Sequence, residues 1–400
     1  MRVLQVVPGL DPLSGGPSRT VPELCRALAE QGTAVTLFST HARGNRITID
    51  PEQQRYEVKL FTAKDGSLAG ARQIGNAIQA RVHDFDLIHI HSLWNFTVTW
   101  AAAAARKAKI PYVLTPMGML SDACLRQHRY ALKRAYARTF DRETVEGAAR
   151  LHFLNEGELR SSQNVWFRNP EHFLAPNGIE IDGRAVRPGS FRERFPELKG
   201  RRIMLFLGRL HPIKGLDLQL EALDRLKLKY PDLIWLLIGP DEGEWQRLDL
   251  LIKKMGLGAN VKWIGPVTGD DRFAALADAD VLLQTSLYEC QSMTVNEAFS
   301  IGVPLVVTDS INYSEVQSSG AGYVVRRDAG ELANAIDAIL QAPDKSEEMR
   351  TAGRRFATEN LSWSRIASIV TAAYEDAIAD FRNHQQRREA GRETQLGASA

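Results

Sequence analysis

The stretch that decides the fold is DVLLQTSLYECQSMTVNEAFSIGVPLVVTD, residues 280–309. Its ends, 280–284 and 304–308, are short apolar runs bounded by turn residues, which is typical of interior strands of a parallel sheet. Between them the pattern predicts a helix that begins near Ser292 and ends at Gly302. The N-terminus of such a helix lies outside the carboxyl end of a strand, where free N–H groups and the helix dipole favour a phosphate. The stretch therefore predicts part of a parallel α/β sheet with an anion-binding edge.

Two carboxylates in this stretch are candidates for sugar contacts. Glu289 falls in the loop before the predicted helix, and Glu297 lies more than one turn inside it. A carboxylate accepts hydrogen bonds in pairs, which suits the vicinal hydroxyls of a sugar or a ribose. Thr294 with Glu297 also fits a helix capping box, so a structural role stays open.

Positive charges for a diphosphate are expected upstream, in LFLGRLHPIKGLD. Residues 203–207 predict a strand that ends in a glycine turn at Gly208, and Arg209 and Lys214 follow it. Arg and Lys at such a turn can bind a diphosphate and stabilise it as a leaving group. The alternative is that both are solvated loop charges.

Several segments together resemble one family. GRLHPIKG, IGPDEGEW, VKWIGPV, NEAFSIGVPLVVTD and NLSW are similar, in sequence and order, to the retaining nucleotide-sugar glycosyltransferases of family 4, including those of bacterial exopolysaccharide and lipopolysaccharide assembly. The resemblance implies a GT-B architecture, in which two Rossmann-like domains face each other across a cleft. It also implies that Arg209 and Lys214 hold the donor diphosphate, that Glu289 lies beside the transferred sugar, and that Glu297 binds the nucleotide ribose.

The resemblance defines the expected donor site. Its catalytic residues are Glu289, Arg209 and Lys214. The expected donor-binding residues are Gly15, Gly16, Gly208, Arg209, Lys214, Glu289, Ser292, Met293, Thr294 and Glu297. No metal and no cofactor are expected, because the nucleoside-diphosphate sugar is the substrate. One departure is Cys290, Gln291 and Ser292, where family members usually carry a Gly-Phe-Gly type stretch.

The N-terminal half carries the expected acceptor side. Gly15 and Gly16 precede Pro17 and suit a tight loop with exposed amides, although a plain helix entry would look similar. His89 and His91 end a strand and share one face, so we expect one packed histidine and His91 near the acceptor, with a metal pair as the alternative. The other expected acceptor-side residues are Met117, where many family members have a histidine, and Gly118.

Residues 125–142, LRQHRYALKRAYARTFDR, predict a basic amphipathic helix. We expect it to contact an anionic membrane surface or a lipid diphosphate acceptor. The expected contact residues are Arg126, Arg129, Lys133 and Arg134. The alternative is a solvated helix of the acceptor domain with its apolar face in the core.

Composition is that of a globular enzyme. The 400 residues are 44% hydrophobic, which gives about two to three domains. A net charge of +2 offers no argument for nucleic acid as a partner. Three widely spaced cysteines indicate a reducing compartment, and no apolar run approaches the roughly 18 residues of a membrane span. We therefore expect a cytoplasmic protein, with peripheral contact to the inner face of the cell membrane.

Alternating strand and helix patterns predict two domains. Strands of the first sheet are expected at 3–7, 34–39, 87–90, 112–115 and 151–154. Strands of the second are expected at 203–207, 234–238, 261–264, 281–284 and 305–308. The predicted division is an acceptor-side domain at 1–180 completed by a helix at 364–382, a linker at 181–198, a donor-binding domain at 199–363, and a disordered tail at 383–400.

These patterns predict a retaining glycosyltransferase of cell-surface polysaccharide biosynthesis. It would move a hexose-like sugar from a nucleoside diphosphate, such as a UDP-sugar or GDP-mannose, to a carbohydrate or lipid-linked acceptor. Two alternatives remain open: a nucleotide-sugar epimerase of the same architecture, which needs no acceptor, and a catalytically silent assembly subunit, which would show no turnover.

Overall fold

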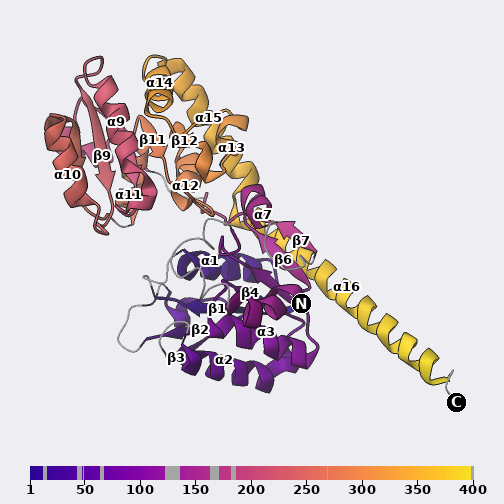
Figure 1. The fold of residues 1–400 in the computed structure, drawn as a ribbon. Helices are drawn as coiled ribbons and strands as arrows, with labels where there is room; N and C mark the ends of the chain where they lie inside the picture. Colours follow the sequence, from indigo (N-terminus) through magenta and orange to yellow (C-terminus); the bar gives the residue numbers. More distant parts are fainter. Residues whose placement is uncertain are drawn as a thin grey trace. The chain divides into compact units, whose positions relative to one another are not determined.

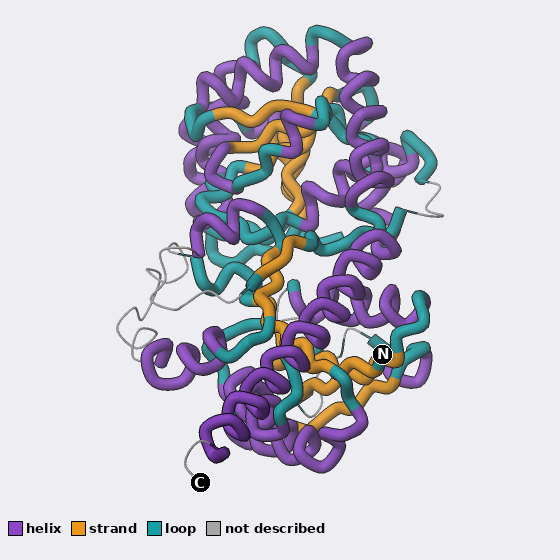
Figure 2. Tube along the Cα trace, turned by 90° about the vertical axis from the view of Figure 1, so that its right-hand side faces the viewer, coloured by secondary structure: helices purple, strands orange, loops and turns teal. Residues whose placement is uncertain are grey.

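The chain folds into two α/β units in the computed structural model (Figure 1). The structure describes residues 1–11, 16–42, 47, 49–63, 67–121, 136–162, 171–181, 186–267 and 269–397. Unit 1 is Met1–Gly178 with Trp363–Ala400, and unit 2 is Ile179–Ser362. Each holds one parallel sheet between helices, as Figure 2 shows by the helices on either side of the strands, which confirms the predicted fold class.

The sheet of unit 1 has, within the described ranges, the strand order β3-β2-β1-β4-β5-β6-β7, with every neighbouring pair parallel. The strands are β1 (Arg2–Gly9), β2 (Ala34–His41), β3 (Glu57–Thr62), β4 (Leu87–His91), β5 (Tyr112–Thr115), β6 (Arg150–Phe153) and β7 (His172–Leu174). The two edge strands, β3 and β7, were not predicted. β3 is partly exposed along its length, so it lacks the continuous apolar run that marks an interior strand.

Helices cover both faces of this sheet because successive strand residues point to opposite sides. Leu4 and Val6 pack with α2 and α3, whereas Val3 and Val7 pack with α1 and α16. The helices are α1 (Pro17–Glu30), α2 (Leu68–Arg81), α3 (Phe96–Ala108), a π-helix (Ala137–Asp141), α6 (Arg142–Glu146), α7 (Glu156–Ser162) and α16 (Trp363–Gly397), with 3₁₀ turns at Pro51–Gln53 and Val82–Asp84.

Helix α16 extends into the segment that was expected to be a disordered tail. The helix does not end at 382 but continues to Gly397. The apolar spacing stops near 381, and the following residues are mostly Gln, Arg, Glu and Ala, which have high helix propensity without an apolar face. Expected disorder from 383 is therefore wrong for residues up to 397.

The sheet of unit 2 has, in the described part, the order β10-β9-β8-β11-β12-β13, again all parallel. The strands are β8 (Arg202–Leu207), β9 (Leu233–Ile238), β10 (Val261–Trp263), β11 (Val281–Gln284), β12 (Leu305–Thr308) and β13 (Gly322–Val325). The helices are α8 (Ser190–Arg194), α9 (Leu216–Leu226), α10 (Trp245–Lys254), α11 (Asp270–Ala277), α12 (Met293–Ile301), α13 (Glu315–Ser318), α14 (Ala329–Leu340) and α15 (Pro343–Asn360). Single 3₁₀ turns occur at Pro196–Leu198, Pro212–Lys214, Gly258–Asn260 and Asp309–Ile311.

The segment predicted as a linker is part of unit 2. Phe191 of α8 and Leu198 are both 0% exposed and belong to the core that α11 and α12 share with the sheet. The polar and glycine-rich composition of 181–198 predicted a linker, although Phe191 and Leu198 anchor the segment in the core.

The predicted basic helix lies largely outside the described residues, which resume at 136. Arg126, Arg129, Lys133 and Arg134 are all in the part that the structure does not describe. Within the described ranges, no helix combines the length and the apolar composition that crossing a bilayer requires.

Candidate functional site

Lys214 and Glu289, which are 75 residues apart in sequence, form an ion pair in unit 2. Lys214 ends the 3₁₀ turn after β8, and Glu289 lies in the loop between β11 and α12. β8 and β11 are neighbours, so parallel pairing brings the two loops to the same edge of the sheet. Each side chain is 15% exposed. The structure thus brings together two of the three predicted catalytic residues.

Two further side chains converge on the same carboxylate. Gln284 Nε2 donates to Glu289 Oε1 at 2.9 Å, and Ser286 Oγ donates to that oxygen at 2.8 Å. Lys214 Nζ also contacts Oε1, and among the described residues no protein group binds Oε2. Glu289 is therefore held by one oxygen, and its other oxygen can accept a hydrogen bond from a ligand hydroxyl.

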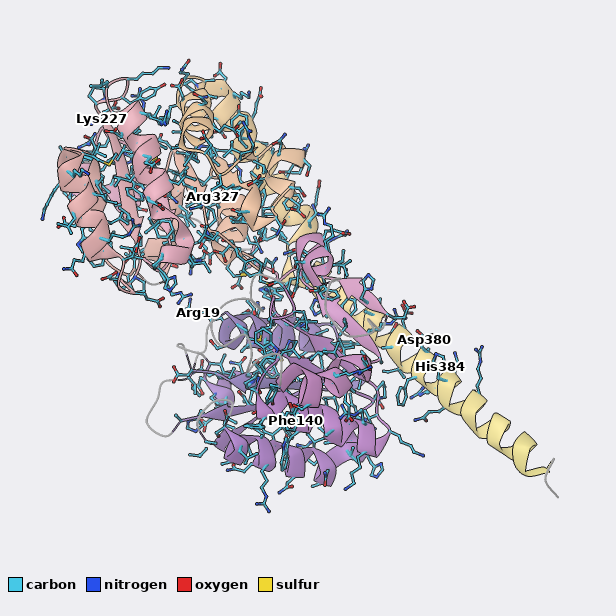
Figure 3. All side chains as sticks on the ribbon, viewed as in Figure 1. Arg19, Phe140, Lys227, Arg327, Asp380 and His384 are labelled. Carbon is cyan, nitrogen blue, oxygen red and sulfur yellow. The ribbon has the colours of Figure 1, made fainter. Side chains whose placement is uncertain are left out.

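The turn that carries Lys214 requires glycine at its next position. Gly215 has φ +62°, and a Cβ there would lie 2.4 Å from the Thr285 carbonyl oxygen and 2.5 Å from Arg327 Nη1. Arg327, labelled in Figure 3, donates to that carbonyl at 2.5 Å. The Thr285 hydroxyl in turn donates to the Lys214 and Gly215 carbonyls at 3.1 and 3.0 Å. These contacts fix the Lys214 backbone against the end of β11.

Arg209 is placed differently from the other predicted catalytic residues. Its side chain is 58% exposed and Nη1 donates to Glu242 Oε2 at 2.6 Å, so it does not join the Lys214–Glu289 pair. Gly208 N donates to Ile238 O at 2.9 Å. Gly239, with φ +149°, approaches so closely that a Cβ would lie 1.8 Å from the Gly208 carbonyl oxygen. The turn after β8 is thus fixed from both sides, while the guanidinium of Arg209 reaches solvent.

Helix α12 begins as predicted, but its cap is not the capping box. Ser292 is the N-cap, and its hydroxyl accepts from Val295 N at 3.4 Å. Thr294 Oγ1 instead donates to the carbonyl of Leu207, the last residue of β8, at 3.1 Å. The first turn of α12, which also contains the half-buried Met293, therefore lies against the end of β8 next to Gly208. The capping-box alternative for Thr294 and Glu297 is wrong.

Glu297 faces α11. It forms an ion pair with Arg272, and the two side chains are 13% and 23% exposed. Sequence reasoning missed Arg272, because a lone charge in a short helix carries no signal. Gln284 and Ser286 were missed too, although polar residues where a buried strand ends are a usable signal.

In unit 1, the predicted glycine loop is only partly described. Gly15 lies outside the described residues. Gly16 is exposed and is the N-cap of α1, where its carbonyl accepts from Arg19 N and Thr20 N at 3.0 and 3.1 Å. In the structure this position is a helix entry with proline at the next residue, which is the plainer of the two interpretations.

His89 and His91 belong to a buried network, in which both ring nitrogens of His89 have hydrogen-bond partners, and this disfavours the metal-pair alternative. The buried histidine network consists of Gln5, His89, His91, Thr115, His152 and Tyr374. His91 is 1% exposed, and its expected contact with an acceptor stays a prediction. The network connects the central strands of unit 1 to α16 through Tyr374.

The hydrogen-bond directions in this network can be assigned by starting from the Ala175 carbonyl oxygen, which can only accept. His152 Nε2 lies 2.7 Å from Ala175 O, which only accepts, so Nε2 carries the hydrogen and Nδ1 accepts from Thr115 at 2.9 Å. The Thr115 oxygen then accepts from His89 Nε2 at 2.6 Å, and His89 Nδ1 accepts from Tyr374 at 2.5 Å. In this order His152 and His89 each carry one ring hydrogen and are neutral.

The same order continues to His91. The Tyr374 oxygen accepts from Gln5 Nε2 at 2.9 Å, and Gln5 Oε1 accepts from His91 Nε2 at 2.8 Å. Burial lowers the pKa of His91 to about 3 and that of His152 to about 4, and it lowers the pKa of His89 well below its usual range.

Met117 and Gly118 form a tight turn after β5. Both have positive φ, +55° and +77°, and Met119 N donates to Pro116 O at 3.1 Å. The buried carboxylate of Glu158 accepts from Gly118 N at 2.5 Å and from Leu154 N at 2.7 Å, which ties this turn to the end of β6. The turn is thus fixed by a residue that sequence reasoning did not single out.

Comparison with known proteins identifies the family of the chain. Residues 15–178 match the glycosyl transferase 4-like domain, and residues 190–356 match glycosyl transferases group 1. D-inositol 3-phosphate glycosyltransferase of Geodermatophilus obscurus is 24% identical over 400 residues, which cover 94% of this chain and 87% of that protein.

Solved structures show the same fold. HepE of Anabaena, in complex with UDP and glucose, aligns with a TM-score of 0.72 at 19% identity, over 94% of this chain and 100% of that one. WaaG, a glycosyltransferase involved in lipopolysaccharide biosynthesis, aligns with a TM-score of 0.66 at 17% identity, over 92% and 99%. Since the two family matches fall in order on the two sheets described above, the chain belongs to the family 4 glycosyltransferases of GT-B architecture.

Proposed function

We propose that the protein is a retaining, metal-independent glycosyltransferase that moves a hexose-like sugar from a nucleoside diphosphate to a carbohydrate or lipid-linked acceptor. The observation that carries this proposal is the way Glu289 is held. Three donors meet on Oε1, which turns a nearly buried carboxylate into a fixed acceptor whose second oxygen can bind a sugar hydroxyl. HepE, which shares the fold, binds UDP and glucose, and this supports a nucleotide sugar as donor.

In the proposed reaction, Lys214 and Arg209 bind the donor diphosphate. The bond between the anomeric carbon and the phosphate oxygen breaks, and its electron pair leaves with the diphosphate. The acceptor hydroxyl oxygen bonds to the anomeric carbon from the same face, and its proton passes to the departing phosphate oxygen. Lys214 stabilises the charge that develops on the leaving group, and Glu289 orients the sugar.

The proposed donor-site contacts can form while the Lys214–Glu289 ion pair stays in place. Lys214 contacts only one carboxylate oxygen, so its ammonium has further donors for a phosphate oxygen. Arg209, with an exposed guanidinium, can bind the diphosphate bidentately if it leaves Glu242. Glu297 is the proposed ribose contact.

The place of the reaction is also a proposal. Support for cell-surface polysaccharide biosynthesis comes from the likeness to WaaG, and support for a polyhydroxylated acceptor comes from the D-inositol 3-phosphate glycosyltransferases. We propose that the enzyme works in the cytoplasm and meets a lipid-linked acceptor at the inner face of the cell membrane through residues 125–142.

Turnover of the full chain tests the function. UDP-glucose, GDP-mannose and ADP-glucose would each be incubated with inositol 3-phosphate, with free hexoses and with a bacterial lipid extract, and products followed by NMR. The proposal expects a product with the donor's anomeric configuration and unchanged rates in EDTA. Inversion would refute the mechanism, and loss of rate in EDTA that manganese restores would refute metal independence. An isomeric nucleotide sugar formed without acceptor would identify an epimerase, and nucleotide binding without turnover would identify an assembly subunit.

A further inference from the structure

Arg272 is the ion-pair partner of Glu297, the proposed ribose contact, and has no role in the reaction proposed above. It is the third residue of α11, and its Nη2 contacts Glu297 Oε2 of α12. With exposures of 23% and 13%, both side chains lie mostly out of solvent. Arg fixes a carboxylate through a planar, preorganised group, so this contact sets the orientation of the Glu297 side chain.

A second observation points to a ligand at the same place. Arg272 Nε is buried, and in the part of the chain that the structure describes no acceptor for its hydrogen is found. Such a donor is unfavourable in a folded protein and is usually satisfied. Because it sits beside a carboxylate proposed to bind ribose, a ligand oxygen is the fitting partner.

One ribose hydroxyl has the hydrogen-bonding capacity to satisfy both groups. A hydroxyl has one hydrogen to donate and lone pairs that accept. It can donate to the Glu297 carboxylate, which has capacity for several hydrogen bonds, while its oxygen accepts from Arg272 Nε. A deoxy carbon does neither, and an O-methyl group cannot donate.

We propose that Arg272 is a positioning and specificity residue of the donor site, which fixes Glu297 and shares with it one hydroxyl of the nucleotide ribose. The inference rests on the proposed function, in which Glu297 binds that ribose. It assigns the choice between ribo- and deoxyribonucleotides to the Arg272–Glu297 pair.

Calorimetric titration of the full chain tests this role. UDP, GDP and ADP are compared with their 2′-deoxy and 3′-deoxy forms, and the readout is the ratio of the deoxy to the ribo Kd. In the wild type the ratio for one of the two hydroxyls should be about ten- to hundredfold, as for a hydrogen bond to a charged group. In Arg272→Leu it should fall to within about twofold of one, with Arg272→Lys between the two.

A matched control is Arg194→Leu. Arg194 forms an ion pair with Asp271, the residue next to Arg272, but its side chain is 59% exposed. Loss of a positive charge at that place should leave the ratio at its wild-type value. An equal drop in both variants would mean that net charge alone sets the affinity, and would overturn the positioning role.

A double variant distinguishes loss of ribose recognition from loss of folding. Arg272→Leu leaves Glu297 nearly buried without its ion-pair partner, and Glu297→Gln in the same chain removes that charge. If the two residues share one hydroxyl, Arg272→Leu should have no further effect on the ratio once Glu297 is Gln. Should the single variant fail to fold, the double variant must still bind ribo and deoxy nucleotides equally. A wild-type ratio in Arg272→Leu, or a wild type that does not distinguish deoxy forms, overturns the inference alone, whereas no binding of any nucleotide overturns the proposed function as well.

Discussion

Replacing Lys214 with Ala should reduce turnover far more than stability. The ammonium is the nearly buried cation at the proposed leaving group, so its loss should raise the barrier by about 2 to 4 kcal/mol, or about 30- to 900-fold in kcat/KM. Arg209→Ala should lie at the lower end of this range, because its side chain is 58% exposed and screened by water.

The stability cost should be small because the carboxylate keeps other donors. Gln284 and Ser286 still hold Glu289 Oε1 when Lys214 is absent. We expect a loss of about 1 kcal/mol, or a fall in Tm of about 2–4 °C for a unit of this size. Release of nucleoside diphosphate and calorimetric melting measure the two effects separately.

The control for this prediction is Lys253→Ala. Lys253 forms an ion pair with Asp249 on the surface of the same unit, where its side chain is 70% exposed. It should keep wild-type turnover. The reasoning is refuted if Lys214→Ala retains turnover within about threefold of the wild type, which corresponds to under about 0.7 kcal/mol, or if Lys253→Ala lowers it equally.

The remaining predictions concern three other parts of the chain. Glu289→Gln should act mainly on kcat, and Glu297→Gln mainly on nucleotide Kd; unchanged values in both would show that the site geometry is wrong. The free energy of unfolding should fall as pH drops below about 6.5, because histidines of the unfolded chain become protonated there, whereas folded His91 and His152 have pKa values of about 3 and about 4 and stay neutral. Each of the two histidines should lower the free energy of unfolding by about 2 kcal/mol between pH 7 and pH 5. Urea denaturation at the two pH values measures this loss, and equal stability would contradict the neutral network. Replacing Arg126, Arg129, Lys133 and Arg134 with Gln should release the protein from anionic vesicles with donor binding intact, and equal sedimentation would assign residues 125–142 to a solvated surface.

Much of the fold could be predicted because interior strands carry strong signals. β11, α12 and β12 follow from one stretch whose apolar runs and terminal glycine leave few choices. β13 was missed because three of its four residues are only partly buried, as was the case for the edge strands of unit 1. Edge strands bury less surface, so their sequence signal is weaker, although the edge strand β10 was predicted at 261–264.

The sequence predicted individual residues of the candidate site but not the contacts between them. Spacing and resemblance pointed to Lys214 and Glu289 separately, whereas the ion pair depends on β8 and β11 being neighbours. The convergence of three donors on one oxygen, and the contact of Arg272 with Glu297, arise from side chains that pack across elements. No local pattern encodes such contacts.

The central claim is that unit 2 binds a nucleoside diphosphate through Lys214 and Glu297. The most direct measurement is thermal melting of the full chain with UDP, GDP and ADP, beside a variant that combines Lys214→Ala with Glu297→Gln. At a hundred times its Kd, one nucleotide should stabilise the wild type by about 2.7 kcal/mol and leave the variant unchanged at the same concentration. If no nucleotide stabilises the wild type, or if the variant is stabilised equally, the donor site is not where this structure places it.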